Sequence, residues 1–71
     1  MGVWPSKKAK VVLRALLKIG WSEKRNEGTS HRVLQRPGFE DYTWAFHDGV
    51  EIGPKMMAKI AKKTGLVPTD L

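Results

Sequence analysis

Hydrophobic residues in the first third of the chain recur at the spacing of an amphipathic helix. They lie at positions i, i+3, i+4, i+7 and i+8, which share one face of an α-helix: Ala9, Val12, Leu13, Leu16 and Leu17. Ser6 is the predicted N-cap, because its hydroxyl can accept a hydrogen bond from a first-turn amide. Gly20 is the predicted end of this helix, because glycine readily adopts a positive φ.

A second helix is predicted between Pro54 and Gly65. Proline suits the first helical position, where its missing N–H costs nothing, and glycine suits the position that closes a helix. The predicted inner face, with Met56 beside it, consists of Met57, Ile60, Ala61 and Thr64. Residues 67–71 are expected to form a tail.

The segment between the helices favours three short strands, over residues 21–25, 31–36 and 42–46. A turn is predicted at 26–28, and Pro37-Gly38 interrupts the chain before the third strand. That strand alternates most clearly, with Tyr42, Trp44 and Phe46 on one face. In the second strand, the pattern does not decide the register, because neither Val33 nor Leu34 dominates its face. The order helix, three strands, helix favours an α+β sandwich with both helices on one face of the sheet.

The length of 71 residues allows one domain, residues 1–71. A chain this short buries only about 60 % of its unfolded surface, so any active site should lie on the surface. Trp4, Trp21 and Trp44 are expected in the core rather than stacked on nucleobases. The absence of cysteine excludes disulfides and thiol chemistry. Without an apolar run of membrane-spanning length, we expect a cytoplasmic protein that does not associate with membranes.

Positive charge is concentrated at the two ends of this chain of net charge +6. Residues 1–20 carry five basic residues and no acid, whereas residues 21–53 carry more acidic than basic residues. Such a field points to a polyanionic partner, although a solvated surface explains it equally well. If the partner is RNA, the predicted phosphate contacts come from one of two helix faces: Lys7, Lys10 and Arg14 (with Lys18), or Lys55, Lys59 and Lys63 (with Lys62).

An ordered set of short motifs resembles the HicA family of toxins from toxin–antitoxin pairs. The set consists of Gly20-Trp21, Arg25, Gly28-Thr29-Ser30-His31, Phe46-His47, Glu51-Ile52 and Gly65-Leu66. The resemblance implies an α-β-β-β-α fold similar to the double-stranded-RNA-binding domain, with a three-stranded antiparallel sheet. It also implies mRNA cleavage that stops translation and growth, with His31 as the essential histidine and His47 as a second, auxiliary one. The implied partner is a HicB-type antitoxin, and we expect a monomer when free and a hetero-oligomer with that antitoxin.

The chemistry of RNA cleavage is consistent with a role for His31. Without a metal, the 2′-hydroxyl attacks the neighbouring phosphate, and a group titrating near neutral pH must accept its proton. Gly28 permits a tight turn whose amides can bind phosphate. We therefore expect RNA contacts from Gly28, Ser30, Arg25 and Arg32. Two histidines without cysteines do not match a metal-ligand spacing, so no metal or other cofactor is expected.

Two other functions remain open from the sequence. A non-catalytic RNA-binding module would use the same basic helices and leave His31 idle. A DNA-binding regulator is disfavoured, because strands separate the two helices and no helix-turn-helix is present.

Overall fold

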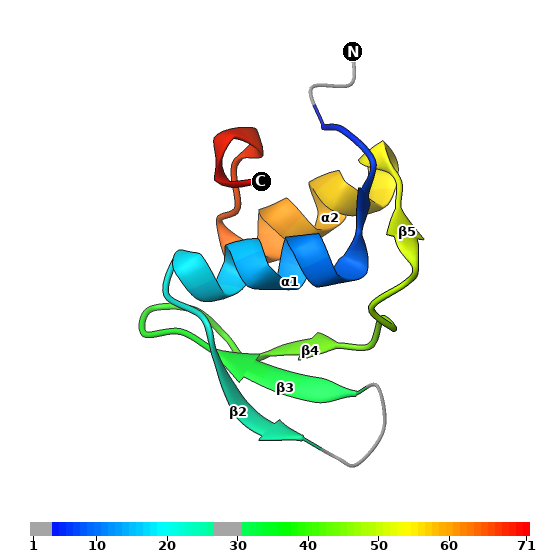
Figure 1. Ribbon diagram of the computed structural model, residues 1–71. Helices are drawn as coiled ribbons and strands as arrows, with labels where there is room; N and C mark the ends of the chain where they lie inside the picture. Colours follow the sequence, from blue (N-terminus) through cyan, green and yellow to red (C-terminus); the bar gives the residue numbers. More distant parts are fainter. Residues whose placement is uncertain (1–3, 27–30) are drawn as a thin grey trace.

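The computed structural model describes residues 4–26 and 31–71 and contains two helices packed over a small sheet (Figure 1). The elements in chain order are β1 (Lys7–Lys8), α1 (Ala9–Lys18), β2 (Ser22–Asn26), β3 (Arg32–Gln35), β4 (Tyr42–Trp44), β5 (Glu51–Ile52), α2 (Pro54–Thr64) and a 3₁₀ helix, η1 (Pro68–Asp70). Strands β2, β3 and β4 pair antiparallel in that order, and both helices lie on one face of this sheet. The predicted α+β fold, similar to the double-stranded-RNA-binding domain, is confirmed.

The start of α1 differs from the prediction. Lys7 and Lys8 form a strand that pairs with β5, and Lys8 is the N-cap residue. The first amides of the helix donate instead to carbonyls of the segment before β5, from Ala9 to Val50 at 2.7 Å and from Lys10 to Asp48 at 3.3 Å. The predictions of Ser6 as N-cap and of Lys7 as a helical residue are therefore wrong, because distant backbone groups satisfy the amides that a side chain usually caps.

The predicted ends of both helices are confirmed. Gly20 follows α1 with φ 113°, and Gly65 closes α2 in the left-handed region with φ 78°. Pro54 is the first residue of α2. Glycine is required at both closing positions, because other L-residues rarely adopt such φ values.

The core lies between the helices and the sheet and contains most of the residues predicted for it. The largest fully buried side chains include Trp21, Trp44, Leu16, Met57 and Ile60. The prediction that tryptophans belong to the core is confirmed for Trp21 and Trp44, and Trp4 packs, partly buried, against the core cluster. The prediction that Leu17 lies on the buried face of α1 is wrong, because 47 % of this residue is exposed.

The two ambiguous residues of the second strand are both buried, on opposite faces of the sheet. Leu34 belongs to the core cluster, whereas Val33 is 9 % exposed and lies outside it. Val33 pairs with Arg25 on one side and Thr43 on the other. Residues paired across strands share a face, so these three form a row on the face that the helices do not cover, called here the open face.

The chain end is not the expected tail. Residues 68–70 form η1, in which a carboxylate oxygen of Asp70 accepts a hydrogen bond from the Val67 amide at 3.0 Å. Leu71 packs partly buried against the core.

Candidate functional site

His31 lies at the start of the central strand, on the open face of the sheet. It is exposed and directly precedes β3, whose first residue, Arg32, pairs with Trp44. Side chains alternate along a strand, so His31 shares the face of Val33 and not that of Leu34. The helices lie on the opposite face (Figure 1), which leaves the imidazole accessible to a large substrate.

His47 reaches the same end of the sheet from β4. Exposed and at least partly buried residues alternate from Thr43 through His47, and the Phe46 ring packs on the core with its centroid 5.0 Å from that of Trp44. The chain therefore keeps its alternation past the end of β4. His31 and His47 both lie just beyond the Arg32–Trp44 pair, on the open face.

The segment that carries His47 is attached to the start of α1. The carbonyl oxygen of His47 accepts from the Val50 amide at 3.0 Å, and the carbonyls of Asp48 and Val50 accept from α1 amides. The Lys8 ammonium donates to the carbonyl of Gly49 at 3.4 Å. These bonds fix the backbone of His47 relative to the basic N-terminal part of α1.

The two arginines predicted beside His31 lie on different faces. Arg25 pairs with Val33 and so shares the open face with His31, whereas Arg32 pairs with Trp44 on the helix side. Arg32 is half-buried and Arg25 is exposed. The predicted Gly28 and Ser30 contacts lie outside the described residues, as does most of the turn predicted at 26–28.

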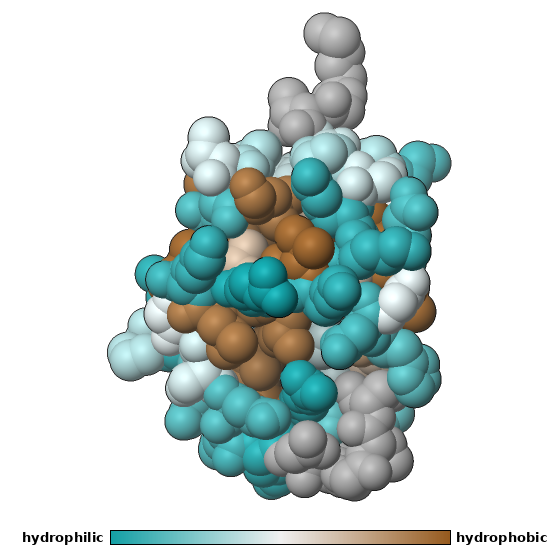
Figure 2. Space-filling view, in the orientation of Figure 1, coloured by the Kyte–Doolittle hydropathy of each residue, from teal (hydrophilic) through white to brown (hydrophobic). Residues whose placement is uncertain are grey.

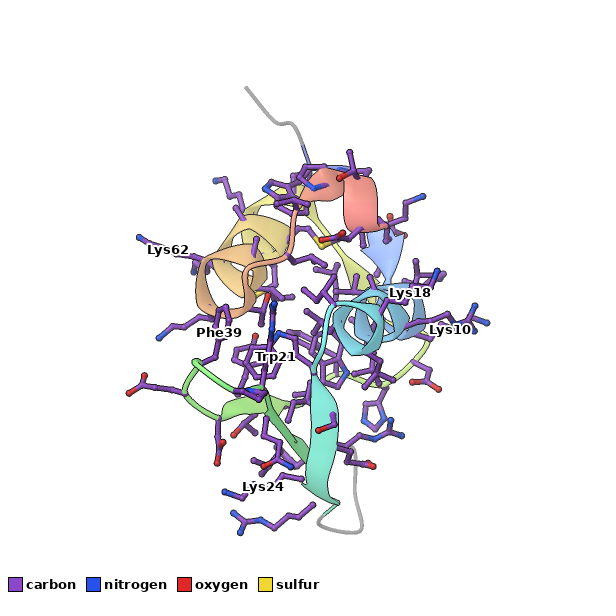
Figure 3. The ribbon with its side chains drawn as sticks, turned by 90° about the vertical axis from the view of Figure 1, so that its left-hand side faces the viewer. Lys10, Lys18, Trp21, Lys24, Phe39 and Lys62 are labelled. Carbon is purple, nitrogen blue, oxygen red and sulfur yellow. The ribbon has the colours of Figure 1, made fainter. Side chains whose placement is uncertain are left out.

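The basic helix faces point to opposite sides of the molecule. In Figure 3, Lys10 and Lys18 of α1 extend to one side and Lys62 of α2 to the other. Helical spacing puts Arg14 with the first pair, and the remaining α2 lysines with Lys62. We call these the α1 basic face (Lys10, Arg14 and Lys18) and the α2 lysine face (Lys55, Lys59, Lys62 and Lys63); all of these side chains are exposed.

A family model described as HicA toxin of bacterial toxin–antitoxin systems matches residues 9–66 of the 71. The match runs from the first residue of α1 to Leu66 and includes both histidines. The chain belongs to the HicA toxin family. The resemblance found in the sequence motifs is thus confirmed, and the protein is a toxin that functions with an antitoxin. No curated protein matches the chain.

In this HicA-family toxin, the α1 side combines basic and apolar surface. Figure 2 shows hydrophobic side chains gathered over the middle of the face to which α1 belongs, with hydrophilic ones between and around them. Leu17, on α1, contributes a side chain that is 47 % exposed. A surface that is both charged and apolar is suited to a protein partner as well as to RNA.

Lys63, one of the predicted RNA contacts, lies at a hollow in the surface that polar and aromatic side chains also line. With Lys62 it lines a hollow of about 480 Å³, together with Phe39, Tyr42 and Thr43 among others. Burial raises the pKa of Tyr42 above its usual value, so this phenol stays neutral at physiological pH. The hollow includes part of the loop between β3 and β4, which lies at the opposite end of the sheet from His31.

Two further features of this HicA-family chain concern metals and membranes. Across residues 4–26 and 31–71, no three side chains of the metal-binding types His, Asp and Glu come together as a possible ligand group. Over the same residues, no helix combines the length and the apolar character needed to span a bilayer.

Proposed function

We propose that this protein is an endoribonuclease that cleaves mRNA, with His31 as the general base. Membership of the HicA family supports a toxin role. The observation that carries the proposal further is the position of His31, which is exposed on the open face of the sheet. A flat, accessible face can bind a long polymer such as RNA. An enclosed cavity in a domain of this size would be too small for one.

The proposed step needs two proton transfers and no metal. His31 takes the proton of the 2′-hydroxyl, the 2′-oxygen bonds to phosphorus, and the bond from phosphorus to the 5′-oxygen breaks. The leaving 5′-oxygen then takes a proton, and the products are a 2′,3′-cyclic phosphate and a 5′-hydroxyl. His47 is the auxiliary residue that we propose as this proton donor, because it lies at the same end of the same face as His31.

For RNA binding, we propose the open face and the α1 side. Arg25 shares the open face with His31, and the Gly28 and Ser30 segment that precedes it is proposed to bind phosphate. Lys7, Lys10 and Arg14 extend this surface, because the start of α1 holds the segment of His47. Lys55, Lys59 and Lys63 face away from it and are proposed as secondary contacts, as is the half-buried Arg32.

The proposed antitoxin is of the HicB type and neutralises the toxin by covering His31 and the α1 side. Its contacting surface should be acidic, because opposite fields speed association, with an apolar part that covers Leu17. Hydrogen exchange on the complex would test this idea. Protection confined to the α2 lysine face would contradict it.

The central experiment compares the purified protein with His31→Ala on a defined RNA. Loss of a general base typically slows a reaction by about 10²–10⁴-fold, and an exposed position should change stability by no more than about 0.5 kcal/mol. A substrate with one 2′-deoxy residue at the cleaved position should be inert, and chelators should have no effect. If the parent binds RNA without cutting it, the protein is an RNA-binding module instead.

A further inference from the structure

Lys24 and Asp41 form an ion pair that joins the two outer strands of the sheet. The Lys24 ammonium donates a hydrogen bond to a carboxylate oxygen of Asp41, 2.8 Å away. Lys24 lies in β2 and Asp41 directly precedes β4, whereas β3 runs between these two strands. The pair therefore has to cross the central strand over one of its two faces.

The pair crosses β3 on the open face. Both helices cover the other face (Figure 1), yet the two side chains are 48 % and 47 % exposed. Figure 3 shows Lys24 on the side of the sheet that faces away from the helices. Strand alternation also places Asp41 on the face of Thr43, which pairs with Val33 in the row of the open face. Lys24 thus shares this face with His31.

Lys24 lies within reach of an RNA strand that contacts His31. The register of β2 shifts at Lys24, and the next residue, Arg25, pairs with Val33. Val33 is two residues along β3 from His31, or roughly 7 Å at about 3.3 Å per residue. A stacked strand of nucleic acid rises about 3.4 Å per nucleotide. An RNA whose cleaved bond lies at His31 therefore reaches Lys24 within a few nucleotides.

Asp41 is the acidic residue that neutralises part of this positive surface. The strands themselves, residues 22–26, 32–35 and 42–44, contain one acidic residue, Glu23, which pairs with Leu34 and so lies on the helix side. Lys24 and Arg25 are exposed. Within these strands the open face therefore carries positive charge and no negative charge, which suits the backbone of RNA.

The ion pair is weak enough for RNA to replace it. An exposed pair of lysine and carboxylate shifts an equilibrium by no more than about fivefold, because water and salt screen both charges. A phosphate oxygen accepts a hydrogen bond from lysine as a carboxylate oxygen does. A phosphate that binds lysine also releases counterions from the RNA. The exchange of the carboxylate for a phosphate therefore costs little and favours RNA at low salt.

We propose that Lys24 binds a phosphate of the RNA substrate, and that Asp41 competes with this phosphate for Lys24 and so limits the affinity of the toxin for RNA. The proposal rests on the RNA-cleaving function above. It adds to the open face a phosphate contact beside Arg25 and a carboxylate whose removal should strengthen RNA binding.

The test is a double-mutant cycle on the affinity for an RNA that cannot be cut, because its 2′-hydroxyls are methylated. Asp41→Asn should bind this RNA about two- to fivefold more tightly than the parent, since it frees Lys24. Lys24→Gln should bind more weakly and flatten the slope of log affinity against log salt by about 0.7. In the double variant, the gain from Asp41→Asn should disappear.

Glu23→Gln is the matched control. It removes the same charge from an exposed neighbour of Lys24 on the other face, and it should change the affinity by less than about twofold. The proposal fails if Asp41→Asn binds RNA no more tightly than Glu23→Gln does. It also fails if the gain persists in the Lys24→Gln background, because Asp41 would then act by general repulsion.

Urea unfolding of the same variants tests whether the pair only links the strands. Lower stability with parental RNA affinity in both Lys24→Gln and Asp41→Asn would overturn the proposal. Both residues are exposed, so both variants should fold. If the parent binds the methylated RNA but does not cut unmethylated RNA, the cleavage function fails, whereas the cycle still decides the role of Lys24.

Discussion

The indole N–H of Trp21 donates a hydrogen bond to the carbonyl oxygen of Thr64, 3.1 Å away, and so ties the start of the sheet to the last turn of α2. Both residues are buried, and the Thr64 hydroxyl donates in turn to the carbonyl of Ile60 at 2.8 Å. The last carbonyls of a helix have no partner inside the helix. This bond therefore satisfies a buried group that water cannot reach.

Trp21→Phe should destabilise the protein more than Trp44→Phe. Trp44 is buried to the same degree, but its indole nitrogen has no hydrogen-bond partner within the described residues. Both variants lose the same ring volume, but Trp21→Phe also leaves the Thr64 carbonyl unpaired, whereas Trp44→Phe removes an N–H that has no partner there. We expect about 1–3 kcal/mol, the cost of leaving a buried acceptor unpaired. Urea unfolding of the three proteins measures it, and equal midpoints for the two variants would show that the bond contributes nothing.

Gly65→Ala should also destabilise, for two independent reasons. Alanine is strained at the observed φ of 78°, and its Cβ would lie 3.3 Å from Cζ of Phe39. Strain at a left-handed position costs about 1–2 kcal/mol. Gly49→Ala is the control, since its Cβ would meet nothing within 4 Å. Thermal melting should show a lower midpoint for the Gly65 variant alone, and a shift of the same size in both variants would contradict this explanation.

The sequence predicts what depends on local spacing. The apolar period of residues 9–16, Pro54 and Gly65 determine the helices and their ends, and these agree with the structure. What it misses depends on pairs that lie far apart in the chain. Lys7 pairs with Ile52, and the amide of Ala9 finds the carbonyl of Val50. No local sequence pattern predicts a partner so far away in the chain. The sequence therefore points to Ser6 as the N-cap.

The candidate site divides in the same way. The family motifs point to His31 and His47, but their common face follows from the strand register and from the alternation of exposed residues after β4. The same register places Arg32 on the other face. A single shift in register would have reversed these faces. The packing of the Arg36 side chain beside Gly20 and Gly65 has no local sequence signal, because these glycines lie far from it in the chain.

The salt dependence of RNA binding should distinguish the two basic helix faces. Removing one contact to a phosphate flattens the slope of log affinity against log salt by about 0.7 for single strands. The double variant Lys10→Gln, Arg14→Gln should therefore reduce the slope by about 1.4. The matched double variant Lys59→Gln, Lys62→Gln removes equal charge from the opposite side and should change the slope little. Titrations of His31→Ala with an uncut RNA at several salt concentrations measure both, and the reverse ranking would move the RNA to the α2 lysine face.

The final prediction separates the two histidines by replacing the leaving oxygen with sulfur. His47→Ala should cleave ordinary RNA about 10²–10⁴-fold more slowly than the parent, if His47 supplies the proton to the 5′-oxygen. In a substrate with a 5′-bridging sulfur, the leaving group is a thiolate. It needs no proton to leave near neutral pH, because thiols have a pKa of about 8.5. His47→Ala should therefore approach the parent rate on this substrate. His31→Ala should stay slow on both substrates, since the 2′-oxygen still has to lose its proton. Equal slowing of His47→Ala on both substrates would show that His47 positions RNA instead of donating a proton, and a parental rate on both would remove it from the reaction.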